Sequence, residues 1–135
     1  MKRPPTDFEL LKTIYELHHP DFVKAQKATQ HGAILVPIDI PAVAGKLEVE
    51  PQMVFGRLYH HLQQVHGEKA EPGKAAIVFF TPIAGNKPNC INFPLLEAVL
   101  AGLWQERRRG AWVTGLAIAS LLVACGSLLV ALGWI

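Results

Sequence analysis

The chain has 135 residues, and all of its 13 basic and 11 acidic side chains lie at or before Arg109. Its formal charge of +2 depends on the run Arg107–Arg109, without which 10 basic residues face 11 acidic ones. The remainder is close to neutral, which excludes the broad basic field that non-specific nucleic-acid binding requires. The length suits one small domain and a short appendage.

The chain has only two cysteines, Cys90 and Cys125. The first falls in a predicted strand and the second in a strongly apolar stretch, so we expect no disulfide framework and a reducing compartment. The first residues, MKRPPTDFELL, lack the apolar run of a secretory signal. We expect residues 1–5 to be a flexible N-terminus.

The first predicted helix begins at a capping box formed by Thr6 and Glu9. Apolar residues recur at helical spacing up to Leu17, and Pro20 is expected to end the helix. Residues 33–38 (AILVPI) form an apolar, partly β-branched run that predicts a short strand.

Two further helices are predicted next, residues 41–47 after Asp39 and residues 51–66 after Glu50. Pro51 suits the first turn of a helix. On a helical wheel the second helix has one apolar face, made of Val54, Phe55, Leu58, Leu62 and Val65.

A β-hairpin and a last helix complete the soluble part. Residues 76–81 (AIVFFT) predict a buried strand, residues 83–89 a turn, and residues 90–93 a returning strand. Pro94 starts a helix over residues 94–110 that connects the domain to the apolar stretch after it.

The apolar stretch, residues 111–135, contains no charged side chain. As a helix it would reach about 37 Å, enough for a hydrocarbon core of about 30 Å. It predicts a single transmembrane helix, whose flanking arginines place residues 1–109 in the cytoplasm by the positive-inside rule. The chain is then expected to be tail-anchored, with its C-terminus at the far face.

The predicted order of elements in residues 6–93 resembles the winged-helix fold. The stretch IPAVAGKLEVEPQMVFGRLYHHL looks like its helix-turn-helix, with the hairpin as the wing. The resemblance implies a small α+β domain (helix, strand, helix-turn-helix, hairpin, helix). It also implies that the helix from Pro51 is the one that would read DNA.

The polar face of that helix is the first candidate site. Opposite the apolar residues lie Met53, Gly56, Arg57, His60, Gln63 and Gln64. Arg57 is the only permanent cation among them, so a solvated or protein-binding face is favoured over DNA contact. We therefore take as the candidate interaction face Met53, Arg57, His60, Gln63 and Gln64, together with Trp104 near the membrane.

The second candidate site is the membrane segment and its boundary. Interface residues are predicted to be Arg107, Arg108, Arg109, Trp112 and Trp134. Small residues that could line a contact with another helix are Gly115, Ala119, Gly126 and Gly133.

The sequence predicts neither catalysis nor a cofactor. Its six histidines, two doublets and two single residues, do not have the spacing of a zinc site. It has no P-loop, dinucleotide fingerprint or nucleophile elbow.

We therefore expect a non-enzymatic, membrane-tethered protein-interaction module or accessory subunit, with a protein partner at the cytoplasmic membrane surface or in the bilayer. One alternative is a membrane-bound winged-helix regulator that binds DNA. Another is a small integral subunit whose transmembrane helix packs in a larger complex.

Overall fold

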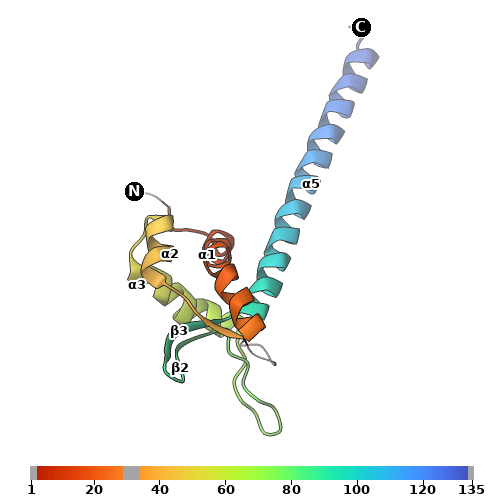
Figure 1. The fold of residues 1–135 in the computed structure, drawn as a ribbon. Helices are drawn as coiled ribbons and strands as arrows, with labels where there is room; N and C mark the ends of the chain where they lie inside the picture. Colours follow the sequence, from red (N-terminus) through yellow and green to blue (C-terminus); the bar gives the residue numbers. More distant parts are fainter. Residues whose placement is uncertain (1–2, 29–33, 134–135) are drawn as a thin grey trace. The chain divides into compact units, whose positions relative to one another are not determined.

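The computed structural model describes residues 3–28 and 34–133. The chain forms two compact units, Met1–Leu100 and Ala101–Ile135. The first unit is a small α+β domain, and most of the second belongs to a long apolar helix (Figure 1). The division falls inside the helix that follows the sheet.

Helix α1 spans Asp7–Ala28 and begins as predicted, with the Glu9 backbone N–H donating to Thr6 Oγ1 at 3.1 Å. The predicted stop at Pro20 is wrong, because α1 continues through it. Aromatic packing holds the second half of the helix in place. The ring of Phe22 stacks on that of Phe93, with centroids 4.6 Å apart, which offsets the hydrogen bond that a proline removes from a helix interior.

Strand β1 spans Leu35–Pro37, and helix α2 spans Ile40–Leu47. The Asp39 carboxylate caps α2 by accepting a hydrogen bond from the Ala42 N–H at 3.1 Å. Glu48 ends the helix in the left-handed conformation, with φ of +57°. These bounds agree with the predicted helix of residues 41–47.

The predicted helix of residues 51–66 is present as three consecutive stretches. They are α3 (Pro51–Gly56), a π-helical segment η1 (Arg57–Leu62) and α4 (Gln63–His66). We call them together the 51–66 helix. A π turn contains more residues than an α turn, so the residues after it are rotated around the helix axis relative to a regular helix. Val65 is therefore 59% exposed, and its predicted place on the apolar face is wrong.

Strands β2 (Phe80–Ala84) and β3 (Lys87–Asn92) form an antiparallel hairpin. Gly85, with φ of +63°, makes the turn between them. Strand β1 pairs with the other edge of β3, so the sheet has the order β1-β3-β2.

The hairpin differs from prediction, because β2 begins four residues later than the expected strand of residues 76–81. The segment between α4 and β2 instead leaves the domain as a two-limbed arm (Figure 1). Glu68 and Ile77 pair across the arm, and Glu71 and Lys74 pair near its tip.

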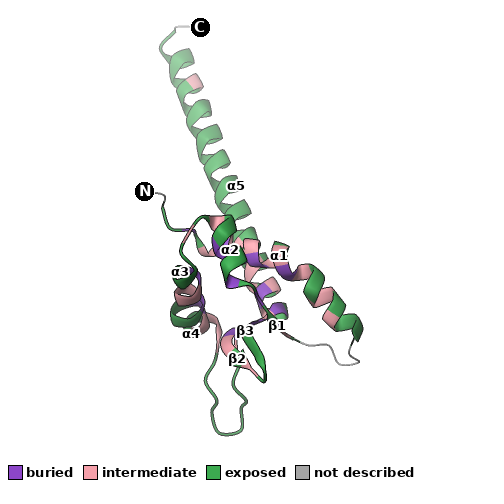
Figure 2. Ribbon diagram, turned by 60° about the vertical axis from the view of Figure 1, so that its left-hand side comes forward, coloured by how far each residue is buried: buried purple, intermediate pink, exposed green. Residues whose placement is uncertain are grey.

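The core of the first unit is built from apolar residues of α1, α2, the 51–66 helix, the sheet and the first turn of α5. Figure 2 shows these buried positions facing one another. Its largest fully buried side chains include Phe79, Phe80, Phe93, Leu10, Leu11, Ile14, Leu58 and Leu62. The core holds the 51–66 helix against β2, which leaves the helix's opposite side to solvent.

Helix α5 spans Phe93–Ala131. The Asn92 side chain caps it, with Oδ1 accepting from the Leu95 N–H at 3.2 Å. From Gly110 onward the helix has no charged residue, and its described side chains are exposed except for half-buried Gly126. The 22 residues from Gly110 to Ala131 reach about 33 Å. Among the described residues, α5 is the one helix long and apolar enough to cross a membrane.

Candidate functional site

The candidate interaction face on the 51–66 helix is only partly available to a partner. Met53 is 43% exposed, and His60 and Gln64 are also exposed. Arg57 and Gln63 are half-buried and bonded inside the domain. The exposed surface of this helix is therefore less polar than the sequence indicates, since Tyr59 and Val65 are exposed as well.

Arg57 binds an acidic residue of its own domain. Its Nη1 donates to Asp7 Oδ1 at 2.9 Å, and His61 Nε2 lies 3.7 Å from the other carboxylate oxygen of Asp7. The carboxylate belongs to the first turn of α1, where a negative charge also complements the helix dipole. The single permanent cation of the predicted recognition face is thus already neutralised locally.

Gln63 has a structural role that sequence patterning missed. Its Oε1 accepts hydrogen bonds from the backbone N–H groups of Phe79 (2.7 Å) and Phe80 (2.8 Å), where the chain enters β2. Gly67 lies against the same side chain, and a Cβ there would collide with it. The helical wheel places Gln63 opposite the apolar face, and the π turn brings it toward the strands.

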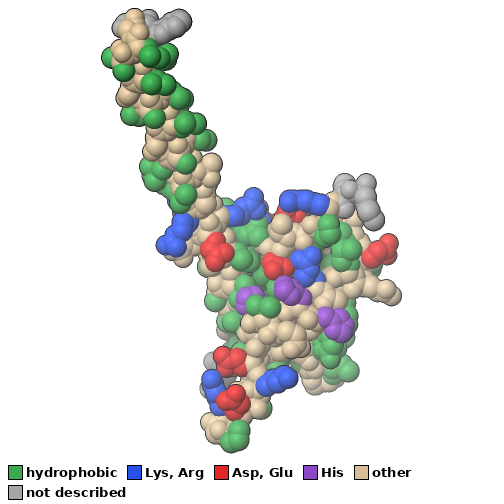
Figure 3. Space-filling model, turned by 180° about the vertical axis from the view of Figure 1, so that it is seen from behind, with side chains coloured by type: hydrophobic (Ala, Val, Ile, Leu, Met, Phe, Trp, Pro, Cys, Tyr) green, Lys and Arg blue, Asp and Glu red, His purple; other side chains and the backbone are tan. Residues whose placement is uncertain are grey.

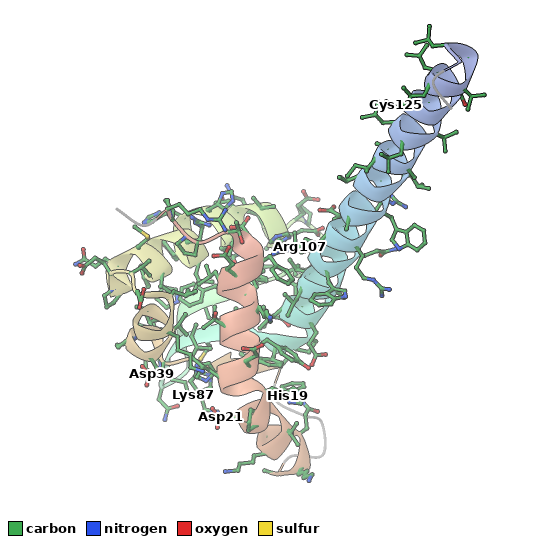
Figure 4. All side chains as sticks on the ribbon, turned by 90° about the horizontal axis from the view of Figure 1, so that it is seen from above. His19, Asp21, Asp39, Lys87, Arg107 and Cys125 are labelled. Carbon is green, nitrogen blue, oxygen red and sulfur yellow. The ribbon has the colours of Figure 1, made fainter. Side chains whose placement is uncertain are left out.

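His18 is a second polar group that the sequence did not single out, and it is buried between two elements. The Asp39 N–H donates to its Nε2 at 3.1 Å, and its Nδ1 lies 3.3 Å from Asp21 Oδ2. Because Nε2 accepts, the proton of the neutral ring is on Nδ1 and faces Asp21. His18 thus joins α1 to the cap of α2; Figure 4 labels Asp21 and Asp39.

The first unit also contains a buried cysteine and several side chains of the types that bind metals. No group of three or more His, Cys, Asp or Glu side chains that could hold a metal occurs in residues 3–28 and 34–133. Cys90 is a free, buried thiol, and burial raises its pKa, with Lys87 opposing the shift. A raised pKa keeps the thiol protonated and unreactive. His31 lies outside the described residues.

One small cavity of the first unit lies beside the start of the 51–66 helix. It is lined by residues of the N-terminal segment, α1 and the start of the 51–66 helix, and its volume is about 10 Å³, the space of one water molecule.

The residues predicted at a membrane interface, and Trp104 of the candidate interaction face, belong to the second unit. Arg107, Arg108 and Arg109 are exposed, Trp104 is 52% exposed and Trp112 69% exposed. Figure 3 shows basic side chains, coloured blue, at the lower end of this helix and no charged side chain above them on the visible face. Figure 4 labels Arg107 at this boundary and Cys125 farther along the apolar part. Trp134 lies outside the described residues.

Three of the four small residues predicted to line a helix contact lie within α5, and the fourth lies after its end. Gly115, Ala119 and Gly126 lie within α5, and a Cβ on either glycine would meet no atom within 4 Å. Gly133 comes two positions after Ala131, the last helical residue; its φ is +74°, and its N–H donates to the Val130 carbonyl. It therefore ends the helix as a C-terminal glycine does, outside any helical stripe.

No protein-family model, curated protein or solved structure matches this chain.

Proposed function

We propose that the chain is a non-enzymatic, membrane-tethered protein-interaction module that serves as an adaptor or accessory subunit. The observation that carries this proposal is the exposed, uncharged stretch of α5 from Gly110 to Ala131, which follows directly on a small folded domain. So many exposed apolar side chains are stable in lipid and unstable in water.

The winged-helix interpretation of the first unit is part of the proposal. Its support is the element order together with the sheet order β1-β3-β2, in which the β2–β3 hairpin occupies the place of the wing. Helix α2 and the 51–66 helix then correspond to the helix-turn-helix.

A protein partner fits the exposed surface of the 51–66 helix better than DNA. Met53, Tyr59 and Val65 are each more than 40% exposed, and such apolar side chains favour protein contacts. DNA affinity comes mainly from several cations on phosphates, whereas Arg57 is paired with Asp7.

The proposed orientation places the first unit on the cytoplasmic side. Its support is the run Arg107–Arg109 at the domain-proximal end of the uncharged stretch.

The test is affinity purification of the full chain from native membranes in mild detergent, with quantitative mass spectrometry. We expect a co-purifying partner that the double variant Met53→Ser/Val65→Ser loses. Ile83→Ser is the matched control, since Ile83 is 70% exposed but lies on β2.

Two results would count against the proposal. One is repeated recovery of the chain alone. The other is equal partner recovery from the double variant and the wild type. Retention of generic duplex DNA by the chain at low salt would instead favour the regulator alternative.

A further inference from the structure

One face of α5 in the second unit combines two indoles and an arginine. Trp104, Arg108 and Trp112 follow one another at intervals of four residues, and side chains at this spacing are neighbours on a helix surface. Both indoles are more than half exposed, and Arg108 is exposed between them.

The acidic residue of this unit lies away from Arg108. Glu106 is two positions before it, which places the two side chains about 160° apart around the helix axis. Glu106 instead shares a shallow hollow with Arg109, Gly102 and Gln105. On the helix surface Glu106 therefore lies nearer to Arg109 than to Arg108.

Two hollows of different chemistry meet at Trp112. The first, which is shallow and widely open, is lined by both indoles together with Gln105, Arg108 and Arg109. The second, equally shallow, is lined by Ala111, Trp112, Gly115 and Leu116. The first therefore offers guanidinium donors, while the second is apolar and opens onto the uncharged part of the helix.

We propose that this face is a binding site for one anionic phospholipid. Arg108, with Arg109 beside it, donates to the headgroup phosphate, since a guanidinium matches phosphate oxygens in a bidentate manner. Trp104 and Trp112 lie at headgroup level, and the apolar hollow at Gly115 takes the upper part of an acyl chain. This inference rests on the proposed membrane tether.

The chemistry that binds the phosphate would also suit a free phosphate ion. The adjoining apolar hollow favours the lipid, because a free anion has nothing to place there. Gly115 has open space where a side chain would be, so the hollow is free for an acyl chain.

The experiment uses the full chain, with Trp134→Phe so that Trp104 and Trp112 carry the fluorescence, in phosphatidylcholine vesicles. A fixed minority of the lipid is either brominated phosphatidylglycerol or brominated phosphatidylcholine, and quenching of tryptophan is measured. We expect phosphatidylglycerol to quench more strongly, with a preference of about fivefold for each arginine engaged near the surface.

Matched variants distinguish a specific lipid site from general electrostatic attraction between the arginines and an anionic bilayer. Arg108→Gln and Arg107→Gln remove the same charge, but only Arg108 lies between the indoles. We expect Arg108→Gln to lose most of the preference and Arg107→Gln to keep most of it. Gly115→Leu, which fills the apolar hollow, should also weaken the preference.

The outcomes distinguish this inference from the membrane tether. If neither brominated lipid quenches, the tether itself fails. Equal quenching by the two lipids would overturn the lipid site while leaving the tether intact, and so would equal losses for Arg107→Gln and Arg108→Gln. Displacement of phosphatidylglycerol by inorganic phosphate, beyond the effect of sodium chloride at equal ionic strength, would assign the site to a free anion and also overturn the inference.

Discussion

The two units of the chain place the same kinds of apolar side chain in opposite surroundings. In the first unit, leucines such as Leu10, Leu11 and Leu58 are fully buried by neighbouring elements. In the second, Leu121 and Leu122 are exposed on a helix whose apolar window has no buried share among the described residues. The first unit therefore buries its own apolar side chains, whereas those of the second stay exposed, as the proposed membrane span requires.

The largest effect is expected from a matched pair of leucine truncations. Leu58→Ala should lower the free energy of unfolding of the first unit by about 2–5 kcal/mol, since it opens a cavity in a packed core. Leu121→Ala should leave that free energy unchanged, because Leu121 is 64% exposed in the other unit. Urea denaturation of the full chain in mild detergent, followed by near-UV circular dichroism, measures both. A comparable loss for Leu121→Ala would contradict the division into two units.

A smaller effect is expected from the neighbouring glutamines. Gln63→Leu leaves the N–H groups of Phe79 and Phe80 without their acceptor, at a cost of about 1–3 kcal/mol. Gln64→Leu is the control, since Gln64 is exposed and should change stability by less than about 0.5 kcal/mol. Equal stabilities of the two variants in the same denaturation assay would show that the Gln63 contacts do not hold the start of β2.

The smallest effect concerns Cys90 at alkaline pH. Burial raises the pKa of its thiol above the usual value near 9. The unfolded chain therefore loses this proton first, so the stability contribution is complete below about pH 9 and falls as the pH rises further. The alkaline loss of stability should be steeper for the wild type than for Cys90→Ala in urea titrations at several pH values. Parallel pH profiles would mean that the thiol is not shielded from solvent in the folded state.

Local patterns predicted the ends of several elements in the first unit. Helix starts were predictable because their signals are local: a side chain that caps the first turn, or a proline in that turn. The caps are Thr6 and Asp39, and the prolines are Pro51 and Pro94. The α+β class with an antiparallel hairpin and a long apolar C-terminal helix followed from the same patterns.

The errors arose where contacts distant in sequence decide the local structure. Pro20 does not end α1 because Phe22 packs on Phe93, a contact that no local rule anticipates. Val65 and Gln63 exchange their expected sides because a π turn precedes them, and regular helical periodicity cannot locate such a turn. The predicted strand of residues 76–81 differs from β2 because the pairing with β3 begins only at Phe80 and continues to Ala84.

The sequence could predict which residues belong to the candidate site, but not which of them are already bonded within the chain. The boundary arginines and tryptophans are identified by their position beside an uncharged stretch. That Arg57 is paired with Asp7 could not be foreseen, since 50 residues separate the two. His18 and Asn92 were missed because a single polar residue beside apolar ones carries no pattern.

The most direct test of the account is alkaline carbonate extraction of membranes that carry the full chain, followed by flotation. We predict that the chain stays with the bilayer, and that Leu121→Arg/Leu122→Arg, which costs about 3 kcal/mol per arginine near mid-membrane, releases it with a folded first unit. Release of the wild-type chain by carbonate would contradict the claim that α5 spans a membrane.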